Sequence, residues 1–186
     1  MNRTKLTISE MNRLTPEVFR QTKKLPLAVV LDNVRSMHNI GAVFRTADAM
    51  CLEQVILCGI CCCPPNRELH KTALGAEDTV PWQYYEETLD AVRDLRSRGY
   101  KVYAVEQTHN SITLEEAAES LSGEAGLDRI AVVFGHEVFG VQQEVIDLCD
   151  GCIEIPQYGT KHSLNVSVTA GIVMYRLSET MRTHEQ

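Results

Sequence analysis

The chain has 186 residues, 44% hydrophobic and 23% charged, which is the composition of one globular domain that can bury its own core. No apolar run reaches the roughly 18 residues that span a bilayer, and the start of the chain lacks the apolar stretch of a secretory signal, so a cytoplasmic protein without membrane segments is expected. The net charge of −7 argues at first against nucleic-acid binding, because phosphate binding needs clustered lysine and arginine.

The basic residues gather near the beginning of the chain. Residues 1–45 hold eight Lys or Arg against three Asp or Glu, a net charge of +5 that leaves −12 for the rest. Residues 1–24 are predicted to form a basic N-terminal extension, with a helix over 15–24 that Pro16 begins at its first turn. Residues 25–182 are predicted to form the main domain. A basic face near the N-terminus is therefore compatible with phosphate binding.

Strands and helices are predicted to alternate along the main domain. Apolar runs of strand length occupy 27–31, 54–58, 81–85, 100–105, 129–134 and 152–155. Helical patterns lie near 39–50, 86–98, 113–120, 141–148 and 163–181, and a glycine-marked turn is expected at 123–126. This alternation predicts an α/β fold with a parallel sheet, in which ligand-binding groups gather at the carboxyl ends of the strands.

Seven cysteines, an odd number, are typical of free thiols in a reducing compartment. The pairs Cys58/Cys61 and Cys149/Cys152 have the spacing of zinc ligands. However, Cys58 and Cys152 fall within strand-like runs, where a cysteine behaves as a small hydrophobic residue. No metal is therefore expected.

The first polar motif, Asn39-x-Gly41-x-x-x-Arg45, lies where the chain leaves its first strand and enters a helix. Gly41 and Arg45 are four residues apart and share the face opposite to the apolar stripe of that helix. A glycine there lets another backbone or a substrate come close, and a guanidinium offers five donors to a phosphate or a carboxylate. Alternatively, Arg45 is a structural residue paired with an acid such as Asp48.

The second motif, Phe134-Gly135-x-Glu137-x-x-Gly140, follows the strand over 129–134. Because Gly135 has no side chain, a ligand is expected to lie against its backbone, and Glu137 is a candidate polar contact or base. A zinc-protease interpretation of His136-Glu137 fails, since its second histidine would fall at Gly140.

In the third motif, a strand stopped by proline leads through a glycine turn into a helix: Ile155-Pro156-x-x-Gly159-x-x-x-Ser163-Leu164-Asn165-Val166-Ser167-Val168. Ser163 is the predicted N-cap of this helix. A P-loop is disfavoured because Glu154 stands where its first glycine is required, and a serine hydrolase because no nucleophile elbow is present. The helix is apolar or small nearly all round, which predicts burial either in the core or partly against a second subunit.

In this order and spacing, the three motifs resemble those of the SpoU/TrmH family of the SPOUT superfamily, over about residues 25–180. The resemblance implies an S-adenosyl-L-methionine-dependent methyltransferase that acts on a ribose 2'-hydroxyl of tRNA or rRNA. It also implies a deep trefoil knot at the C-terminal end and a homodimer as the active form. A knot would be one of the rare exceptions to unthreaded chain topology.

The resemblance also assigns roles to residues. The methyl donor is expected around Gly135, Ile155 and Leu164, and at Glu106, Gln107 and Ser163. Arg45 is expected to handle the attacking hydroxyl, and Asn39, Glu137, Ser163 and Asn165 to complete the catalytic set. The residues expected to contact RNA are Arg35, Arg45 and Lys161.

Two alternatives stay open at this point. A guanidinium is normally always protonated, so Arg45 either acts as a base in a state altered by phosphate and desolvation, or positions the phosphate and stabilises the developing alkoxide. The second alternative is a binding module that holds RNA or the donor without catalysis. The joint presence of Asn39, Arg45, Glu137 and Asn165 favours the enzyme.

Overall fold

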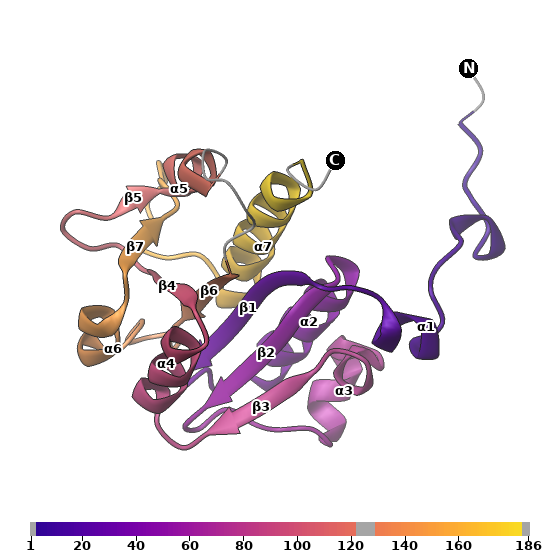
Figure 1. The fold of residues 1–186 in the computed structure, drawn as a ribbon, viewed down its shortest axis with the longest axis horizontal. Coiled ribbons are helices and arrows are strands. Elements are labelled where there is room, and N and C mark those ends of the chain that lie inside the picture. The colour runs from indigo at the N-terminus through magenta and orange to yellow at the C-terminus, as the bar shows by residue number, and fades with distance from the viewer. Residues whose placement is uncertain (1–2, 122–128, 184–186) are drawn as a thin grey trace.

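The computed structural model describes residues 3–121 and 129–183, which form a parallel seven-stranded sheet with helices on both faces (Figure 1). The strands lie in the order β3-β2-β1-β6-β4-β7-β5. Their bounds are β1 Leu25–Asp32, β2 Leu52–Cys58, β3 Trp82–Tyr85, β4 Tyr100–Val105, β5 Ile112–Thr113, β6 Arg129–Phe134 and β7 Gly151–Glu154. The predicted α/β fold with a parallel sheet is confirmed.

The helices cover the sheet because the central strands are apolar on both faces. Along β1, Leu27 and Val29 face a core shared with α2, α5 and α7, whereas Ala28 and Val30 face a second core shared with α4 and α6. The helices are α1 Pro16–Gln21, α2 Met37–Ala49, α3 Arg67–Ala73, α4 Thr88–Ser97, α5 Leu114–Leu121, α6 Gln143–Leu148 and α7 Val166–Thr183, with 3-10 turns at Ser9–Met11 and Ala76–Asp78. Within the described ranges, no helix is long and apolar enough to cross a membrane.

The N-terminal segment extends away from the rest of the fold and reaches the sheet through α1 (Figure 1). Pro16 begins α1 as predicted, and the Thr15 side chain caps this helix by accepting a hydrogen bond from Val18 N at 3.4 Å. The helix ends at Gln21, three residues earlier than predicted, because Thr22 is already extended. Phe19 alone in α1 is buried, so a single side chain of α1 joins the core.

One α-helix, α3, and one strand, β5, were not predicted from the sequence, and neither were the two 3-10 turns. The Asn66 side chain caps α3 by accepting from Glu68 N at 2.9 Å and Leu69 N at 3.1 Å. Only Leu69 and Ala73 of α3 are buried, which is too few apolar positions to reveal a helical period. β5 is two residues long and pairs with β7, far away in the sequence. The turn predicted at 123–126 lies outside the described residues.

Candidate active site

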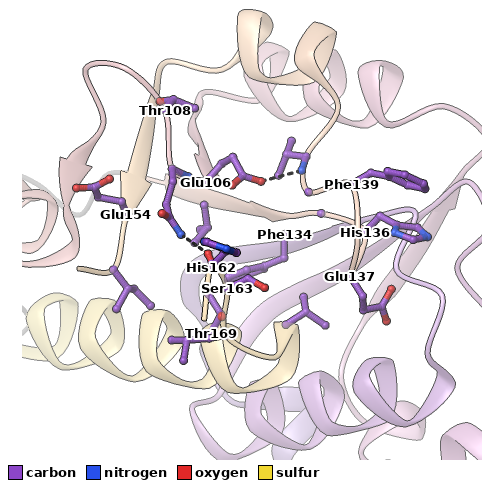
Figure 2. A pocket seen from close by; sticks show the side chains of 18 of the residues that line it. Glu106, Thr108, Phe134, His136, Glu137, Phe139, Glu154, His162, Ser163 and Thr169 are labelled. Atoms are coloured by element: carbon purple, nitrogen blue, oxygen red, sulfur yellow. Dashed lines mark hydrogen bonds between the residues drawn. The ribbon is translucent and has the colours of Figure 1, made fainter. Parts of the chain in front are cut away.

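A pocket of about 710 Å³ lies at the carboxyl ends of β4, β6 and β7, against the start of α7 (Figure 2). This volume is typical of sites for small molecules. The residues predicted to hold a donor all line it: Glu106, Gln107, Gly135, Ile155, Ser163 and Leu164. The structure therefore brings together six residues that the sequence scatters over three loops.

Two glycines shape the loop that follows β6. A Cβ atom at Gly135 would overlap the backbone of Gly140 and Val141, and Gly140 has a positive φ of 69°. The turn between them is closed by paired backbone hydrogen bonds of His136 and Gly140, at 3.0 and 2.9 Å. The loop's own backbone therefore occupies the place of a Gly135 side chain, and because Gly135 also lines the pocket, a ligand lying against its backbone stays a prediction.

Glu106, at the end of β4, fastens this loop to its neighbours. Its carboxylate accepts hydrogen bonds from Val141 N at 3.1 Å and from Gln107 N at 2.9 Å. The Gln107 side chain in turn donates to the carbonyl of His162 at 3.0 Å. The end of β4 thus connects the loop after β6 with the loop before α7.

The three polar motifs meet in one chain of hydrogen bonds beside the pocket. Asn39 Nδ2 donates to Glu137 Oε1 at 3.1 Å, and Asn165 Nδ2 donates to Asn39 Oδ1 at 3.3 Å. The two Glu137 oxygens also accept from Arg35 N at 3.0 Å and Ser36 N at 2.9 Å. Glu137 therefore fixes the loop between β1 and α2, and Asn39 links that loop to the third motif.

The pKa of Glu137 is lowered by these contacts. Partial burial acts to raise it, but the donors at Arg35 N, Ser36 N and Asn39 Nδ2 outweigh burial. The carboxylate therefore stays ionised at neutral pH and remains an acceptor.

Replacement of Glu137 by glutamine is expected to lower the free energy of unfolding at neutral pH by about 1 kcal/mol, since an amide replaces a charged acceptor at an exposed site. Because folding lowers the pKa, the contribution is fully present above the unfolded-state pKa of about 4.3 and is lost as the pH falls through the folded-state value. Urea unfolding of both proteins at about pH 7 and about pH 3 measures this. A difference that stays constant between the two would contradict it.

Two predicted boundaries near the motifs are wrong. Asn39 lies within the first turn of α2, because the Ser36 side chain caps this helix by accepting from Asn39 N at 3.3 Å. α7 begins at Val166, and Asn165 rather than Ser163 caps it, accepting from Ser167 N at 2.9 Å and Val168 N at 3.4 Å. An asparagine so placed satisfies the free amides, so Ser163 stays in the pocket lining.

Arg45 is exposed on α2, and within the described part of the chain it makes no hydrogen bond or ion pair. Asp48 instead accepts a hydrogen bond from Thr79 Oγ1 at 2.9 Å, so the structural ion pair of Arg45 and Asp48 is not formed. Gly41 admits α3, since a Cβ atom there would overlap Thr72 Oγ1 and the carbonyl of Leu69.

The residues predicted to contact RNA stand apart from the pocket lining. Arg35, Arg45 and Lys161 are all exposed, and none of them lines the pocket. These three side chains are therefore accessible to a large ligand on the surface and do not take part in holding a small molecule in the pocket.

Asp32 is a site residue that the sequence did not reveal. It ends β1 and is fully buried, and its carboxylate accepts from Thr88 Oγ1 at 2.6 Å, Gln142 Nε2 at 2.8 Å and Gln142 N at 3.0 Å. It therefore holds the far end of the loop that carries Glu137. The available signal was a carboxylate directly after a buried apolar run, where an unpaired charge would be costly.

Of the paired cysteines, Cys58 and Cys61 are buried, and Cys149 and Cys152 are partly buried. Burial raises the pKa of Cys58, Cys61 and Cys149 to about 12, which keeps them protonated at neutral pH. Cys61 Sγ lies 3.2 Å from the carbonyl oxygen of Leu31, as a weak donor.

The fold and the site define a parallel α/β protein with a small-molecule pocket built by loops at the carboxyl ends of its strands. Residues 26–175 match the model of the SpoU rRNA Methylase family, and the chain belongs to this family.

Two relatives illustrate the range of the family. The chain is 33% identical over 172 residues to the 23S rRNA (guanosine-2'-O-)-methyltransferase RlmB of Neisseria meningitidis, covering 89% of this chain and 62% of that protein. It is 32% identical over 163 residues to the tRNA (guanosine(18)-2'-O)-methyltransferase of Thermus thermophilus, covering 88% and 79%. The chain thus spans less than two thirds of the length of the first of these relatives.

Solved structures share the fold. The A. aeolicus TrmH/SpoU tRNA modifying enzyme superposes with a TM-score of 0.78 at 24% identity, covering 91% of this chain and 84% of that one. An AdoMet-bound rRNA methyltransferase from Sinorhizobium meliloti gives a TM-score of 0.73 at 25% identity, covering 94% and 62%.

Proposed function

We propose that this chain is an S-adenosyl-L-methionine-dependent methyltransferase that modifies a ribose 2'-hydroxyl of tRNA or rRNA. The observation that carries the proposal is the hydrogen-bonded chain of Glu137, Asn39 and Asn165, which joins three separate motifs beside one pocket. Family membership supports it, as do the names of the relatives, which act on guanosine 2'-hydroxyls of 23S rRNA and tRNA.

The pocket lining suits such a donor. Phe134, Ile155 and Leu164 offer apolar walls, and the loop backbones offer polar groups for an adenine edge. Glu106 and Glu154 also line it, and their negative charge favours a cationic ligand. When bound, the donor supplies a methyl group activated by its sulfonium, and the protein has to align the acceptor and help remove a proton.

The polar residues divide this work. Arg45 is free to donate to a phosphate and to the oxygen on which charge develops, and it acts either as the base or as this stabilising group. Asn39, held by Glu137 and Asn165, orients the RNA beside it. Ser163 contributes at the pocket lining, and Arg35 and Lys161 contact the RNA backbone. Together Arg45, Asn39, Glu137, Ser163 and Asn165 form the proposed catalytic set.

The same proposal includes a trefoil knot and the division of the chain into a basic extension, 1–24, and a methyltransferase domain, 25–182. Two observations support the knot: β7 is inserted between β4 and β5, and the segment before α7 is fastened to Gln107 at the end of β4. A cytoplasmic location fits an RNA substrate and seven free cysteines.

The experiment is transfer of a tritiated methyl group from S-adenosyl-L-methionine to total RNA, followed by nucleoside analysis. A labelled 2'-O-methylnucleoside is the expected product. Donor binding without any such product would favour the binding module instead.

A homodimer is the proposed active form, and the exposed surface of α7 is the observation that supports this proposal. On α7, Val168, Ile172 and Tyr175 are 40–55% exposed and follow one another at intervals of four and three residues, so they share one face of the helix. Such an apolar stripe is typical of a surface that a second subunit covers.

The replacement Ile172→Asp is therefore expected to convert a dimer into a monomer in sedimentation velocity and to abolish methyl transfer, because a charge would be buried between subunits. Ile60→Asp is the matched control, since Ile60 is 58% exposed elsewhere on the surface. A variant that remains dimeric would place the interface on another face.

A further inference from the structure

A basic edge lies beside the helix that carries Arg45. It consists of His38 on α2 and of Arg67 and Lys71 on α3, and all three side chains are exposed. We call these three residues the α3 basic edge. The proposed mechanism makes no use of them.

The packing of α3 on α2 fixes the position of this edge. Gly41 lets α3 approach until Thr72 and the Leu69 carbonyl fill the space of a side chain. Thr72 Oγ1 then donates to the carbonyl of His38 at 3.0 Å. The two helices are thus joined at the turn that precedes Asn39, next to the meeting point of the three motifs.

The edge continues the surface that begins at Arg45. His38 and Arg45 are seven residues apart on α2, which is close to two helical turns, so they lie on one face. Their separation along the helix axis is about 10 Å.

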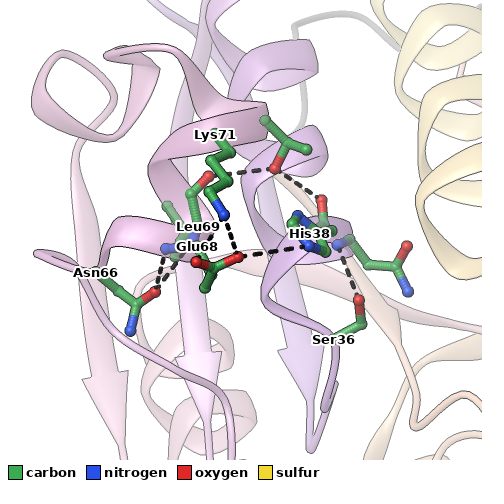
Figure 3. A network of polar contacts seen from close by, with 8 residues as sticks. Ser36, His38, Asn66, Glu68, Leu69 and Lys71 are labelled. Carbon is green, nitrogen blue, oxygen red and sulfur yellow. Dashed lines mark hydrogen bonds and ion pairs between the residues drawn. The ribbon is translucent and has the colours of Figure 1, made fainter.

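One acid, Glu68, lies within the edge and is already neutralised. Lys71 Nζ donates to its two oxygens at 2.7 and 2.8 Å, and His38 Nε2 lies 3.9 Å from Oε2 (Figure 3). The hydrogen bond from Lys71 lowers the pKa of Glu68. Exposed ion pairs of this kind contribute little to stability, so Lys71 can exchange its partner for another anion.

We infer that the α3 basic edge binds the phosphate backbone of the RNA, next to the ribose that lies beside Arg45. This inference rests on the proposed function, since it takes RNA as the substrate. Arg67 and Lys71 add two positive charges next to His38, and on a chain with a net charge of −7 they concentrate attraction for phosphate at this edge. Glu68 weakens that attraction, because its carboxylate forms an ion pair with Lys71.

The test measures binding of a fluorescein-labelled, unmodified tRNA transcript and of a labelled RNA hairpin by fluorescence anisotropy over a series of salt concentrations. The double replacement of Arg67 and Lys71 by glutamine is expected to weaken binding about tenfold and to reduce the salt slope by about two. Glu68→Gln is expected to tighten binding roughly threefold, because it releases Lys71. Donor binding should be unchanged in both, and kcat at saturating RNA within about twofold.

Arg93→Gln is the matched control. Arg93 lies on α4, in the layer on the other face of the sheet, and pairs with Asp90 at the same three-residue spacing as the pair of Lys71 and Glu68. The Arg93→Gln variant should bind RNA with the affinity and the salt slope of the unaltered protein.

The outcomes separate the edge from the enzyme. An RNA affinity of the double variant within about twofold of the unaltered protein, or weaker binding by Glu68→Gln, would overturn the inference while leaving methyl transfer standing. If the unaltered protein binds RNA but transfers no methyl group, the proposed activity fails, and the variants still decide the edge. If it binds neither RNA, both proposals are wrong.

Discussion

Arg45→Ala is expected to reduce methyl transfer by about a hundredfold or more while leaving donor binding unchanged. The side chain is exposed, has no partner within the described residues and does not line the pocket, so its loss disturbs neither the core nor the donor site. What is lost is a set of donors for a phosphate and for the oxygen that gains charge during transfer. Initial rates at saturating donor, together with calorimetric donor titration, measure the two effects separately.

Two further variants sharpen this result. Arg93 lies on another surface, and its side chain is 61% exposed. Arg93→Ala should therefore leave the rate of methyl transfer unchanged. Arg45→Lys keeps the charge but loses the planar donor array, so an intermediate rate is expected if geometry matters and a nearly normal rate if charge alone does. Near-normal turnover by Arg45→Ala would remove Arg45 from the catalytic set.

Asp32→Ala is expected to lower the free energy of unfolding by about 3 kcal/mol and to impair methyl transfer as well. The substitution deprives the hydroxyl of Thr88, which is 1% exposed, of its acceptor, and it frees both donors of Gln142. Because Gln142 ends the loop that begins at Gly135, Glu137 would lose its fixed position relative to Asn39. Urea unfolding and the transfer assay, performed on the same preparation, test both parts.

Asp90→Ala serves as the control for Asp32. Asp90 is 63% exposed and forms an ion pair with Arg93 on the surface of α4, so its removal should change stability by less than about 0.5 kcal/mol. If Asp32→Ala unfolds at the same urea concentration as Asp90→Ala, the buried carboxylate does not hold the loop.

Local signals in the sequence predicted much of this molecule. The runs over 129–134 and 100–105 are strands with the predicted bounds. Strands that are buried on both faces consist of nearly uninterrupted apolar residues, so their ends are visible in the sequence. Pro16 and the apolar stripe of α2 likewise marked helices. The donor residues also converge, since the loops of a parallel sheet emerge at a common edge.

The remaining features depend on contacts between distant segments. Gly135 has no room for a side chain, because the backbone of Gly140 and Val141 occupies the place of its Cβ atom. The short strand β5 forms because β7 lies beside it and pairs with it. Whether Ser163 or Asn165 capped α7 could not be decided from spacing, since both residue types are good caps. Asp32 is an acceptor for Gln142, more than a hundred residues later, and no local pattern records such a pair.

The order of the strands has a consequence for how the chain becomes active. β4 has its two neighbours, β6 and β7, later in the sequence, and the pocket closes only against the start of α7. During synthesis, the first three strands can pair as they emerge, but nothing can bind in the pocket until residues 151–169 have reached their places. Affinity for a small ligand therefore requires this segment as well as the sheet, and ligand binding reports that residues 151–169 are in place rather than only that the first strands have paired.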